Sequence, residues 1–387
     1  MQTNSWVRTH SAFAGRGAKA LLLLLLFCFL LPGFTGHAET KAPSAFPSLF
    51  AVARIKGPLK FCGEEVRLDK NNARERMEKE MLLTLWDRPQ VVLWFKRSRR
   101  YFPLIEKKLK AHQMPADLKY MALIESALRP HVGSPRGAVG FWQFTPSTGK
   151  KYGLQIDSEK DERRNIDKST DAAIAYLKEL YETFGSWTLA AAAYNMGEHG
   201  LQAEMMLQKS ENFYELYLPL ETQRYVFRIV SAKCIMTQPQ TYGFHFSRKD
   251  LYPPPEYEAV EMECFDETPI ALVARAARTR FKVIKDLNPE LRGHYLHAGR
   301  HLIKVPEGAA EGFQSRLTSL IKKWGKKQKD RVYVVKKGDN LSSIAERFNV
   351  PLPVLLIWNN QDFTDPIHPG DRLVIHSHEK RRQQDAE

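Results

Sequence analysis

The chain has 387 residues, of which 43% are hydrophobic and 26% charged, as in folded proteins rather than disordered chains. Lysine and arginine outnumber aspartate and glutamate by 58 to 44, and the net charge of +14 favours an anionic partner such as nucleic acid, phospholipid or an acidic wall polymer. Four cysteines exclude a disulfide-dense scaffold, and one disulfide or buried free thiols are equally open for Cys62, Cys234 and Cys264. The sequence has no Cys/His cluster at zinc-site spacing and no glycine-rich nucleotide loop, so we expect neither a metal nor a cofactor.

The N-terminal segment 1–38 has the pattern of a secretory signal peptide. Three basic residues precede an apolar run over 20–31, and small residues stand at positions −3 and −1 of a cleavage site after Ala38. The run is short for the ~30 Å hydrocarbon core of a membrane, although a retained signal anchor stays open. Cys28 follows Phe27 instead of a small residue, so we expect no lipid attachment there. We therefore expect secretion of the chain, and a net charge lowered from +14 to +11.

Residues 58–250 have the pattern of a helical domain. Apolar spacing or helix-forming composition predicts helices over 72–97, 101–112, 116–128, 169–184, 187–196 and 221–236. Gly185 and Gly197 are expected to end helices, and Ser186 to cap one. The stretch 129–166 is rich in glycine, proline, serine and arginine, and we expect a long irregular loop there. Loops of that length inside a compact domain are often functional.

The C-terminal third contains an internal repeat, in which one copy matches the next at a constant offset. Asn288 falls on Asn359, among other matches, and no gap is needed. Each copy, over 260–308 and 331–377, has the pattern strand, helix, helix, strand. A basic, polar segment at 322–330 is expected to join them. Because about fifty residues build only a marginal core, each copy is typical of a small binding module rather than a catalytic domain.

The helix expected over 116–128 carries the candidate catalytic acid. Glu125 shares one face with Leu118 and Met121 at helical spacing, so a carboxyl group lies in an apolar stripe. Burial among apolar side chains raises the pKa of a carboxyl group, as a general acid requires. The alternatives from periodicity alone are a partly exposed glutamate at the helix end, or one paired with Arg129.

Three further segments contain candidate binding residues. Ser134 and Gln143 belong to a loop in which small residues allow a close backbone approach, and its aromatic and amide groups suit a carbohydrate ring. The aromatic residues of this loop are equally consistent with core positions. Tyr194 and Asn195 end an alanine-rich helix, either as a cap or as site residues. Tyr225 is expected in the core or on a helix surface by default.

Three short motifs follow one another in a fixed order along the helical domain: Glu125-Ser126, Gly140-x-x-Gln143 and Ala193-Tyr194-Asn195. This ordered set resembles the lytic transglycosylases of the soluble, goose-lysozyme-like superfamily, and most closely their membrane-bound D type. The likeness covers about residues 100–245. The copy at 331–377 resembles a LysM peptidoglycan-binding domain. The copy at 260–308 resembles a degenerate one, because it lacks the Gly-Asp turn.

The resemblance implies a mainly α protein, with a lysozyme-like helical catalytic domain followed by two small α+β (βααβ) LysM-type modules. It implies cleavage of the β-1,4 bond between N-acetylmuramic acid and N-acetylglucosamine without water, which leaves a 1,6-anhydro ring. Glu125 corresponds to the single catalytic acid and base. The residues that correspond to substrate-binding positions are Ser134, Gln143, Tyr194, Asn195 and Tyr225. Phe141-Trp142 stands where Leu-Met is commoner in the family.

The implied partner is the glycan strand of peptidoglycan, and not nucleic acid, since the basic residues form no clustered stripe. Association with the outer or inner membrane stays open, because the expected lipid-attachment motif is missing. Two rivals remain: a muramidase of the same fold that uses water, and an inactive peptidoglycan-binding protein. A muramidase needs a second carboxyl group, for which Asp157, Asp161 and Glu162 are the nearest candidates.

Overall fold

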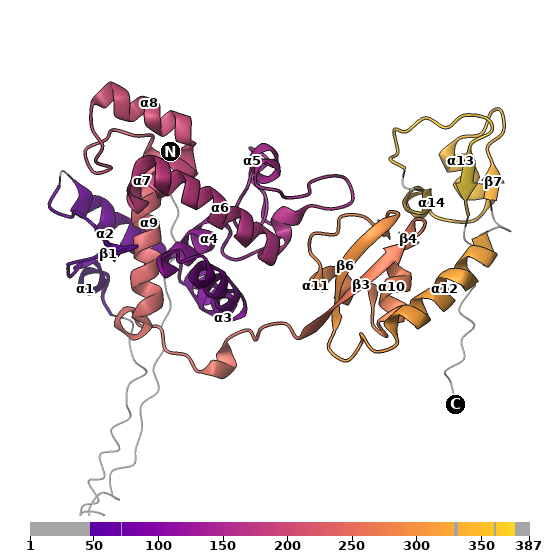
Figure 1. The fold of residues 1–387 in the computed structure, drawn as a ribbon, viewed down its shortest axis with the longest axis horizontal. Coiled ribbons are helices and arrows are strands. Elements are labelled where there is room, and N and C mark those ends of the chain that lie inside the picture. Colours follow the sequence, from indigo (N-terminus) through magenta and orange to yellow (C-terminus); the bar gives the residue numbers. More distant parts are fainter. Residues whose placement is uncertain (1–46, 71, 329–331, 360, 376–387) are drawn as a thin grey trace, which may run out of the picture. The chain divides into compact units, whose positions relative to one another are not determined.

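The computed structural model describes residues 47–70, 72–328, 332–359 and 361–375 (Figure 1). The predicted signal peptide, residues 1–38, lies outside these ranges. The described chain is mainly helical up to residue 250 and mixes strands with helices after it. The predicted fold class, mainly α followed by two small α+β modules, is confirmed. No helix in the described ranges is long and apolar enough to cross a membrane.

The helical part runs from indigo to pink in Figure 1. Its helices are α1 (Leu49–Ala53), α2 (Ala73–Trp86), α3 (Arg88–Ala111), α4 (Lys119–Ser126), α5 (Pro146–Lys151), α6 (Ile166–Phe184), α7 (Trp187–Met196), α8 (Glu198–Gln208) and α9 (Leu220–Thr237). A short antiparallel hairpin precedes α2 and consists of β1 (Lys60–Phe61) and β2 (Glu64–Glu65). Residues 116–118 and 162–164 form single 3₁₀ turns.

The helix predicted over 72–97 is two helices that meet at Asp87. The Asp87 side chain accepts a hydrogen bond from the Gln90 N–H at 3.2 Å, and Pro89 follows in the first turn of α3. An aspartate cap and an early proline both favour the start of a helix. The chain therefore begins a new helix inside a stretch whose apolar spacing is continuous. α3 then runs on through the segment predicted separately over 101–112.

The boundary between α6 and α7 follows the expected capping chemistry. Gly185 ends α6 with φ of 66°, a left-handed conformation that glycine adopts without strain. Ser186 caps α7, and its hydroxyl accepts a hydrogen bond from the Leu189 N–H at 3.4 Å. Gly197 ends α7. These three predictions are confirmed.

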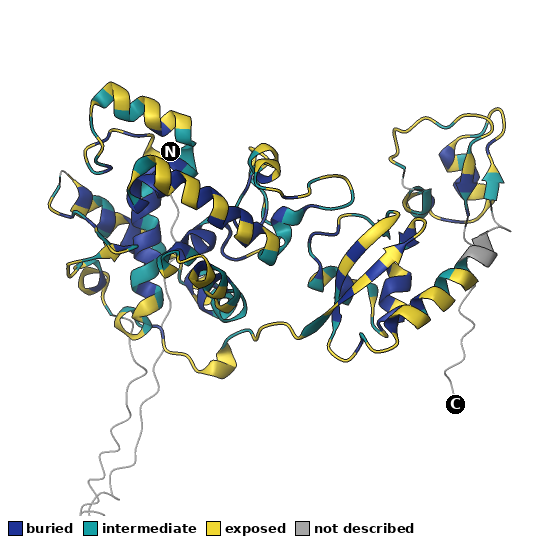
Figure 2. Ribbon diagram, in the orientation of Figure 1, coloured by how far each residue is buried: buried dark blue, intermediate teal, exposed yellow. Residues whose placement is uncertain are grey.

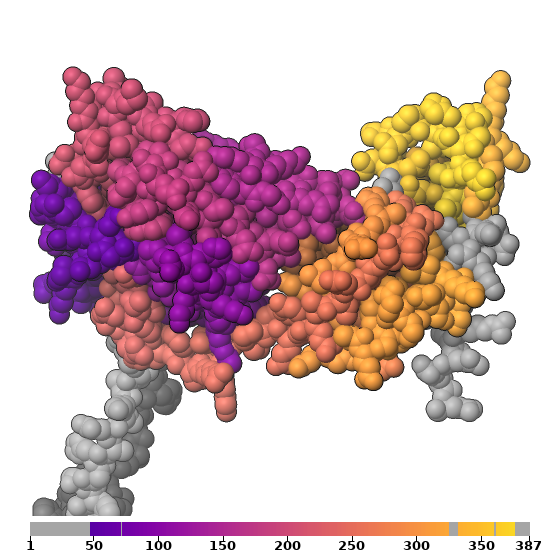
Figure 3. Space-filling view, in the orientation of Figure 1, coloured from indigo at the N-terminus to yellow at the C-terminus, as the bar shows by residue number. Residues whose placement is uncertain are grey.

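Buried apolar side chains from α1 to α9 form one core (Figure 2). The four alanines at 190–193 of α7 are at most 1% exposed, and α7 packs against α6, α8 and α9. Side chains this small let helices approach closely. α2 packs against α9, and Figure 3 shows the indigo atoms of the first helices against the pink ones. α4, which carries Glu125, packs against both α3 and α9.

The stretch 129–166 is less irregular than predicted. It contains α5, which starts at Pro146 after a threonine cap, since the Thr145 hydroxyl accepts a hydrogen bond from the Thr148 N–H at 3.2 Å. Isolated β-bridges link Val139 to Gly133 before it and to Phe144 after it. Short-range capping and bridging of this kind leaves no periodic apolar pattern for sequence reasoning to detect.

The second C-terminal module has the predicted order strand, helix, helix, strand, and the first has the same order with one additional short strand before its helices and another after them. The first consists of β3 (Tyr257–Cys264), β4 (Thr268–Pro269), α10 (Ile270–Ala276), α11 (Phe281–Leu287), β5 (Tyr295–Leu296) and β6 (Gly299–Pro306). The second consists of β7 (Val332–Val334), α13 (Leu341–Arg347), α14 (Leu352–Asn359) and β8 (Arg372–Val374). In each module the outer strands pair antiparallel, β3 with β6 and β7 with β8. The offset that aligns Asn288 with Asn359 also maps the start and end of α10 onto those of α13.

The repeated asparagines have the same structural role in both modules. Asn288 exchanges hydrogen bonds with the backbone of Lys304, donating to its carbonyl at 2.8 Å and accepting from its N–H at 2.8 Å. Asn359 does the same with Val374, at 3.0 Å and 2.6 Å. Each asparagine thereby fastens the end of the second helix to the last strand.

The basic segment 322–330 is not a simple linker. α12 (Phe313–Gln328) continues through most of it, and its buried residues Phe313 and Leu317 complete the core of the first module.

The three described cysteines are free thiols, of which Cys264 is buried and Cys62 and Cys234 are partly buried. Burial raises the pKa of the Cys62 and Cys234 thiols, which makes them weak nucleophiles. Of the two alternatives that the sequence left open, the free thiols are therefore the one present in the described chain.

Candidate active site

Glu125 lies in the last turn of α4. Beyond Ser126 the backbone turns left-handed at Ala127 and Leu128, with φ of 52° and 57°. The buried hydroxyl of Ser126 donates to the carbonyl oxygen of Phe141 at 2.8 Å. Ser126 thus joins the end of α4 to the glycine-rich loop. Glu125, the residue before it, lies next to this connection.

The carboxyl group of Glu125 receives a hydrogen bond from α9. The hydroxyl of Tyr225 donates to Glu125 Oε1 at 2.5 Å, and Tyr225 is 2% exposed. Burial raises the pKa of Glu125 to about 7, while the Tyr225 hydrogen bond and the charge of Arg228 oppose this rise and the charge of Glu221 adds to it. A carboxyl group of this pKa can donate and accept a proton near neutral pH. Arg129, the alternative partner, donates instead to the Ser126 carbonyl at 3.2 Å.

A cavity of about 310 Å³ lies beside Glu125, between α2, α3, α4 and α9. Its charged lining residues are Glu80, Asp87, Glu125, Arg129, Arg224 and Arg228. α2 and α3 therefore form part of the cavity wall, with residues that belong to none of the three motifs.

Glu80 is a second carboxyl group in this cavity, and sequence reasoning missed it. Its side chain is 3% exposed and accepts hydrogen bonds from Arg224 Nε at 2.6 Å and Nη2 at 3.2 Å. Buried charges require a close partner of opposite sign, and this two-pronged pair supplies it. The same pattern that indicated Glu125, a carboxyl group in an apolar helical stripe, could have indicated Glu80. Glu80 follows the buried Met77 by three positions and precedes the buried Met81.

The Gly-x-x-Gln motif folds its own loop. Gln143, with φ of 49°, donates through Nε2 to the carbonyl oxygens of Val132 at 3.1 Å and Gly140 at 2.8 Å. Gly140 has φ of 86°, and a Cβ there would lie 1.9 Å from the carbonyl oxygen of Arg163. Only glycine fits this position. The spacing of the motif is therefore a folding requirement as well as a candidate binding feature.

Ser134 lies in the turn that opens this loop. Its hydroxyl accepts a hydrogen bond from the Ala138 N–H at 3.1 Å, and its own N–H donates to the Ala138 carbonyl at 2.8 Å. The described contacts of Ser134 all lie within the turn, and its position beside a substrate stays a prediction.

Arg163, which belongs to none of the motifs, binds the backbone of the same loop. Its side chain is 6% exposed, and its guanidinium donates to the carbonyl oxygens of Gly137 at 2.8 Å and Phe144 at 3.0 Å. Asp161, which is 0% exposed, accepts from Arg163 Nε at 2.8 Å and Nη2 at 2.9 Å. The carboxyl group of Asp161 thus holds the Arg163 guanidinium in place.

The other two acids proposed for a water-using mechanism are also engaged in the loop. Asp157 accepts from the backbone N–H groups of Glu159 and Lys160, and Glu162 accepts from that of Gln155. Each of these carboxylates stabilises a turn. The segment 155–165 therefore contributes no carboxyl group to the lining of the Glu125 cavity.

Tyr194 and Asn195 end α7 next to the same region. The Tyr194 hydroxyl donates to the carbonyl oxygen of Trp142 at 2.7 Å. Burial raises the pKa of Tyr194, and the charge of Glu125 raises it further, so the two side chains are electrostatic neighbours. Asn195 Oδ1 accepts from the Thr222 hydroxyl at 2.9 Å, which leaves the amide NH₂ of Asn195 to donate elsewhere. The pair therefore has contacts beyond those of a helix cap.

The aromatic residues of the glycine-rich loop belong to the core. Phe141, Trp142 and Phe144 are 1%, 0% and 3% exposed, and the Trp142 indole N–H donates to the Thr170 hydroxyl at 3.1 Å. The interpretation that these rings face a carbohydrate is wrong, because their faces are covered by protein and the indole is satisfied internally.

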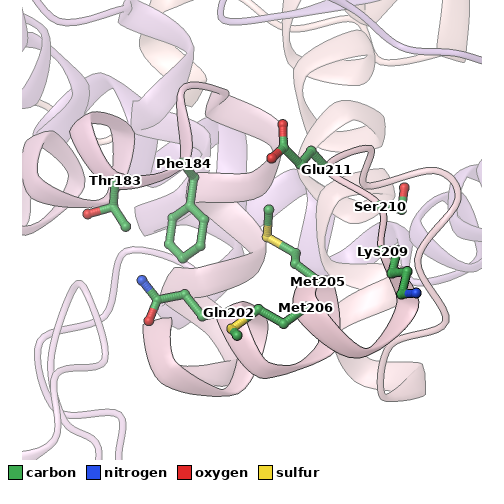
Figure 4. Close-up of a pocket in the computed structure, with 8 residues that line it drawn as sticks. All are labelled: Thr183, Phe184, Gln202, Met205, Met206, Lys209, Ser210 and Glu211. Carbon is green, nitrogen blue, oxygen red and sulfur yellow. The ribbon is translucent and has the colours of Figure 1, made fainter.

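A larger pocket of about 690 Å³ lies away from these residues. Figure 4 shows its lining from the end of α6, from α8 and from the loop that follows α8. Its apolar lining residues are Phe184, Met205 and Met206, and none of the motif residues lines it. The described part of the chain also contains no group of three or more metal-ligating side chains.

Comparison with known proteins gives a domain assignment. Residues 102–216 match the family described as "Transglycosylase SLT domain", and residues 333–376 match the LysM domain. The chain therefore contains both domains, as the motifs predicted. Glu80, Arg224, Tyr225 and Arg228 all lie outside the 102–216 match.

Two relatives carry the same printed name. The chain is 31% identical over 294 residues to membrane-bound lytic murein transglycosylase D of Escherichia coli strain K12, and equally to that of strain O6:H1. Each alignment covers 72% of this chain, and the chain spans 64% of the length of these relatives. The crystal structure of the 70 kDa soluble lytic transglycosylase of Escherichia coli aligns with a TM-score of 0.33 and 18% identity, over 44% of this chain and 31% of that one.

Proposed function

We propose that this chain, with its SLT and LysM domains, is a peptidoglycan lytic transglycosylase. It cleaves the β-1,4 bond from N-acetylmuramic acid to N-acetylglucosamine without water and binds the wall through residues 331–377. The observation that carries the proposal is Glu125, a carboxyl group within the SLT match whose pKa burial raises to about 7 and which lines a cavity. The names of the two relatives support the same activity.

One carboxyl group is sufficient for the reaction. Protonated Glu125 gives its proton to the glycosidic oxygen, and the bond from that oxygen to C1 of the muramic unit breaks. The acetamido oxygen of the substrate stabilises C1, and Ser134 and Asn195 hold the acetamido group. Ionised Glu125 then takes the proton of the C6 hydroxyl, whose oxygen bonds to C1 and closes the 1,6-anhydro ring. The enzyme is returned to its initial protonation state.

The surroundings of Glu125 suit both proton transfers. The hydrogen bond from Tyr225 stabilises the ionised carboxylate that exists between the two steps, and burial keeps the proton available for the first step. Gln143 and Tyr194 are proposed cleft residues, and their hydrogen bonds to the Gly140 and Trp142 carbonyl oxygens support this role by fixing the loop and joining it to the end of α7.

The test is mass spectrometry of the soluble products after digestion of purified peptidoglycan with residues 39–387. We expect muropeptides lighter by one water than hydrolysed ones. Glu125→Gln should lower their release by a factor on the order of 10³, as loss of a general acid and base does, while the variant still sediments with purified sacculi. Lysis that persists in Glu125→Gln would remove Glu125 from its role.

The same experiment decides between the rivals. Products with reducing ends would mean a muramidase that activates water, for which the cavity lining offers Asp87, which caps α3, and the buried Glu80. Its pairing with Arg224 favours a structural role instead. Intact wall binding without any release would mean an inactive peptidoglycan-binding protein.

The proposed location is the cell envelope, where the substrate is found. A signal peptide over residues 1–38 accounts for export to the periplasm, and association with the inner or outer membrane is a further part of the proposal. Fractionation of cells that express the full chain tests both, since a soluble periplasmic fraction and a membrane fraction separate the outcomes.

A further inference from the structure

The cavity beside Glu125 contains a cation that the cleavage mechanism does not use. Of the three arginines in its lining, Arg224 is paired with Glu80 and Arg129 donates to a backbone carbonyl. Arg228, on α9, is half-buried and has no hydrogen-bond or ion-pair partner among the described residues. A partly desolvated guanidinium without a partner is unfavourable in the free protein and is ready to receive an anion.

Trp94, on α3, also lines this cavity and has an unsatisfied donor. The residue is 7% exposed, and its indole Nε1 is buried without a hydrogen-bond partner in the described part of the chain. Indole and guanidinium groups donate hydrogen bonds and cannot accept them. A ligand that satisfies both therefore offers acceptor oxygens, and the charge of Arg228 selects a negatively charged one.

Both donors are close to the proposed reaction centre. They line the cavity that Glu125 lines, and the charge of Arg228 lowers the pKa of Glu125. Both lie outside residues 102–216: Trp94 is on the part of α3 before the SLT match, and Arg228 is on α9 after it. The sequence motifs consequently gave no indication of them.

We propose that Arg228 and Trp94 bind the acidic substituent on O3 of the muramic acid unit at the cleaved bond. This inference rests on the proposed function. The substituent is the lactyl carboxylate or, where a stem peptide is attached, the carbonyl and carboxylate groups of that peptide. The backbones of peptidoglycan and chitin differ only in this substituent. The two residues are thus specificity determinants that distinguish muramic acid from N-acetylglucosamine.

The experiment measures binding by isothermal titration calorimetry in the inactive Glu125→Gln background. The three probes have the same length: chitotetraose, a peptide-free tetrasaccharide of alternating N-acetylglucosamine and N-acetylmuramic acid, and the same tetrasaccharide with stem peptides. The variants are Arg228→Gln, Arg228→Lys and Trp94→Phe. Arg74→Gln is the matched control, because it removes the same charge from an exposed position of α2 away from the cavity.

Arg228→Gln should weaken binding of the muramic acid glycans about tenfold, as loss of a hydrogen bond to a charged group does, and that of chitotetraose less than about twofold. Trp94→Phe should show a smaller loss with the same selectivity. Arg228→Lys should recover part of the affinity, and Arg74→Gln should bind like the parent. Selective loss for the peptide-free glycan assigns the lactyl carboxylate, and selective loss for the peptide-bearing glycan alone assigns the stem peptide.

Equal losses for all three probes would make Arg228 a structural residue and overturn the inference, as would unchanged affinity for the muramic acid glycans. A parent Glu125→Gln protein that binds none of the three probes would refute the proposed function, and the inference with it. That outcome is distinct, because it appears before any substitution at Arg228.

Discussion

At the scale of single residues, the acid strength of Glu125 is a balance between groups that lie far apart in the sequence. Desolvation raises its pKa, the Tyr225 hydrogen bond and the Arg228 charge lower it, and the result is about 7. Glu125 and Tyr225 are separated by 100 positions. A carboxyl group in an apolar stripe is therefore only the starting condition, and the partners on α9 set the final value.

Tyr225→Phe tests this balance. The hydroxyl stabilises the ionised form of Glu125, so its removal raises the pKa of the carboxyl group further. Because the protonated form acts as general acid, wild-type activity should fall as the pH rises through about 7, and in the variant this fall should move up by about one pH unit. The measurement is kcat/KM for muropeptide release as a function of pH. Tyr217→Phe, at an exposed tyrosine, is the control, and identical profiles for both variants would contradict the argument.

At the scale of elements, the glycine-rich loop depends on a buried ion pair that follows it in the sequence. Arg163 donates to two carbonyl oxygens of the loop, and Asp161 neutralises it. Gly140 lies against the Arg163 backbone, where no side chain fits. The loop and the 3₁₀ turn at 162–164 are therefore one structural unit.

Asp161→Asn should lower the free energy of unfolding by about 3–5 kcal/mol, because it leaves the Arg163 guanidinium buried without a counter-charge. Equilibrium denaturation in urea measures the change. Asp69→Asn is a matched control: Asp69 pairs with Arg67 on the surface, where water screens both charges, so its loss should lower the stability far less. If the two variants lost equal stability, the buried pair of Arg163 and Asp161 would contribute no more than a surface pair.

At the scale of the whole molecule, the proposed catalytic part and the proposed wall-binding module have separate hydrophobic cores. The buried apolar residues of the second module, from Val335 to Ile375, form a cluster separate from that of the helical part. Inside the module, Asp339 accepts hydrogen bonds from the Tyr333 hydroxyl at 2.6 Å and the Lys336 N–H at 2.8 Å, and so closes its own turn.

Deletion of residues 331–387 should therefore weaken sedimentation with purified sacculi more than it slows the turnover of short, soluble glycans. A chain that lacks only residues 378–387 is the control and should behave like the full chain in both assays. Equal losses of binding and turnover after the larger deletion would make the module part of the catalytic unit.

Features that depend on neighbours along the chain were visible in the sequence. The apolar stripe around Glu125, the caps at Gly185 and Ser186, and the repeat that aligns Asn288 with Asn359 follow from helical spacing and turn chemistry, which act over a few residues. The same local rules failed at Asp87, where a cap interrupts a continuous apolar pattern.

Features that depend on packing were decided only by the tertiary structure. Contact between α4 and α9 brings Tyr225 to Glu125, and contact between α2 and α9 brings Arg224 to Glu80. From the sequence, Trp142 could equally face a ligand or the core. The structure shows that its indole N–H donates to the Thr170 hydroxyl on α6, so it belongs to the core. Periodicity states which face of a helix is apolar but not which helix covers it. That choice, made by the summed burial of all the helices, determines what surrounds the carboxyl group.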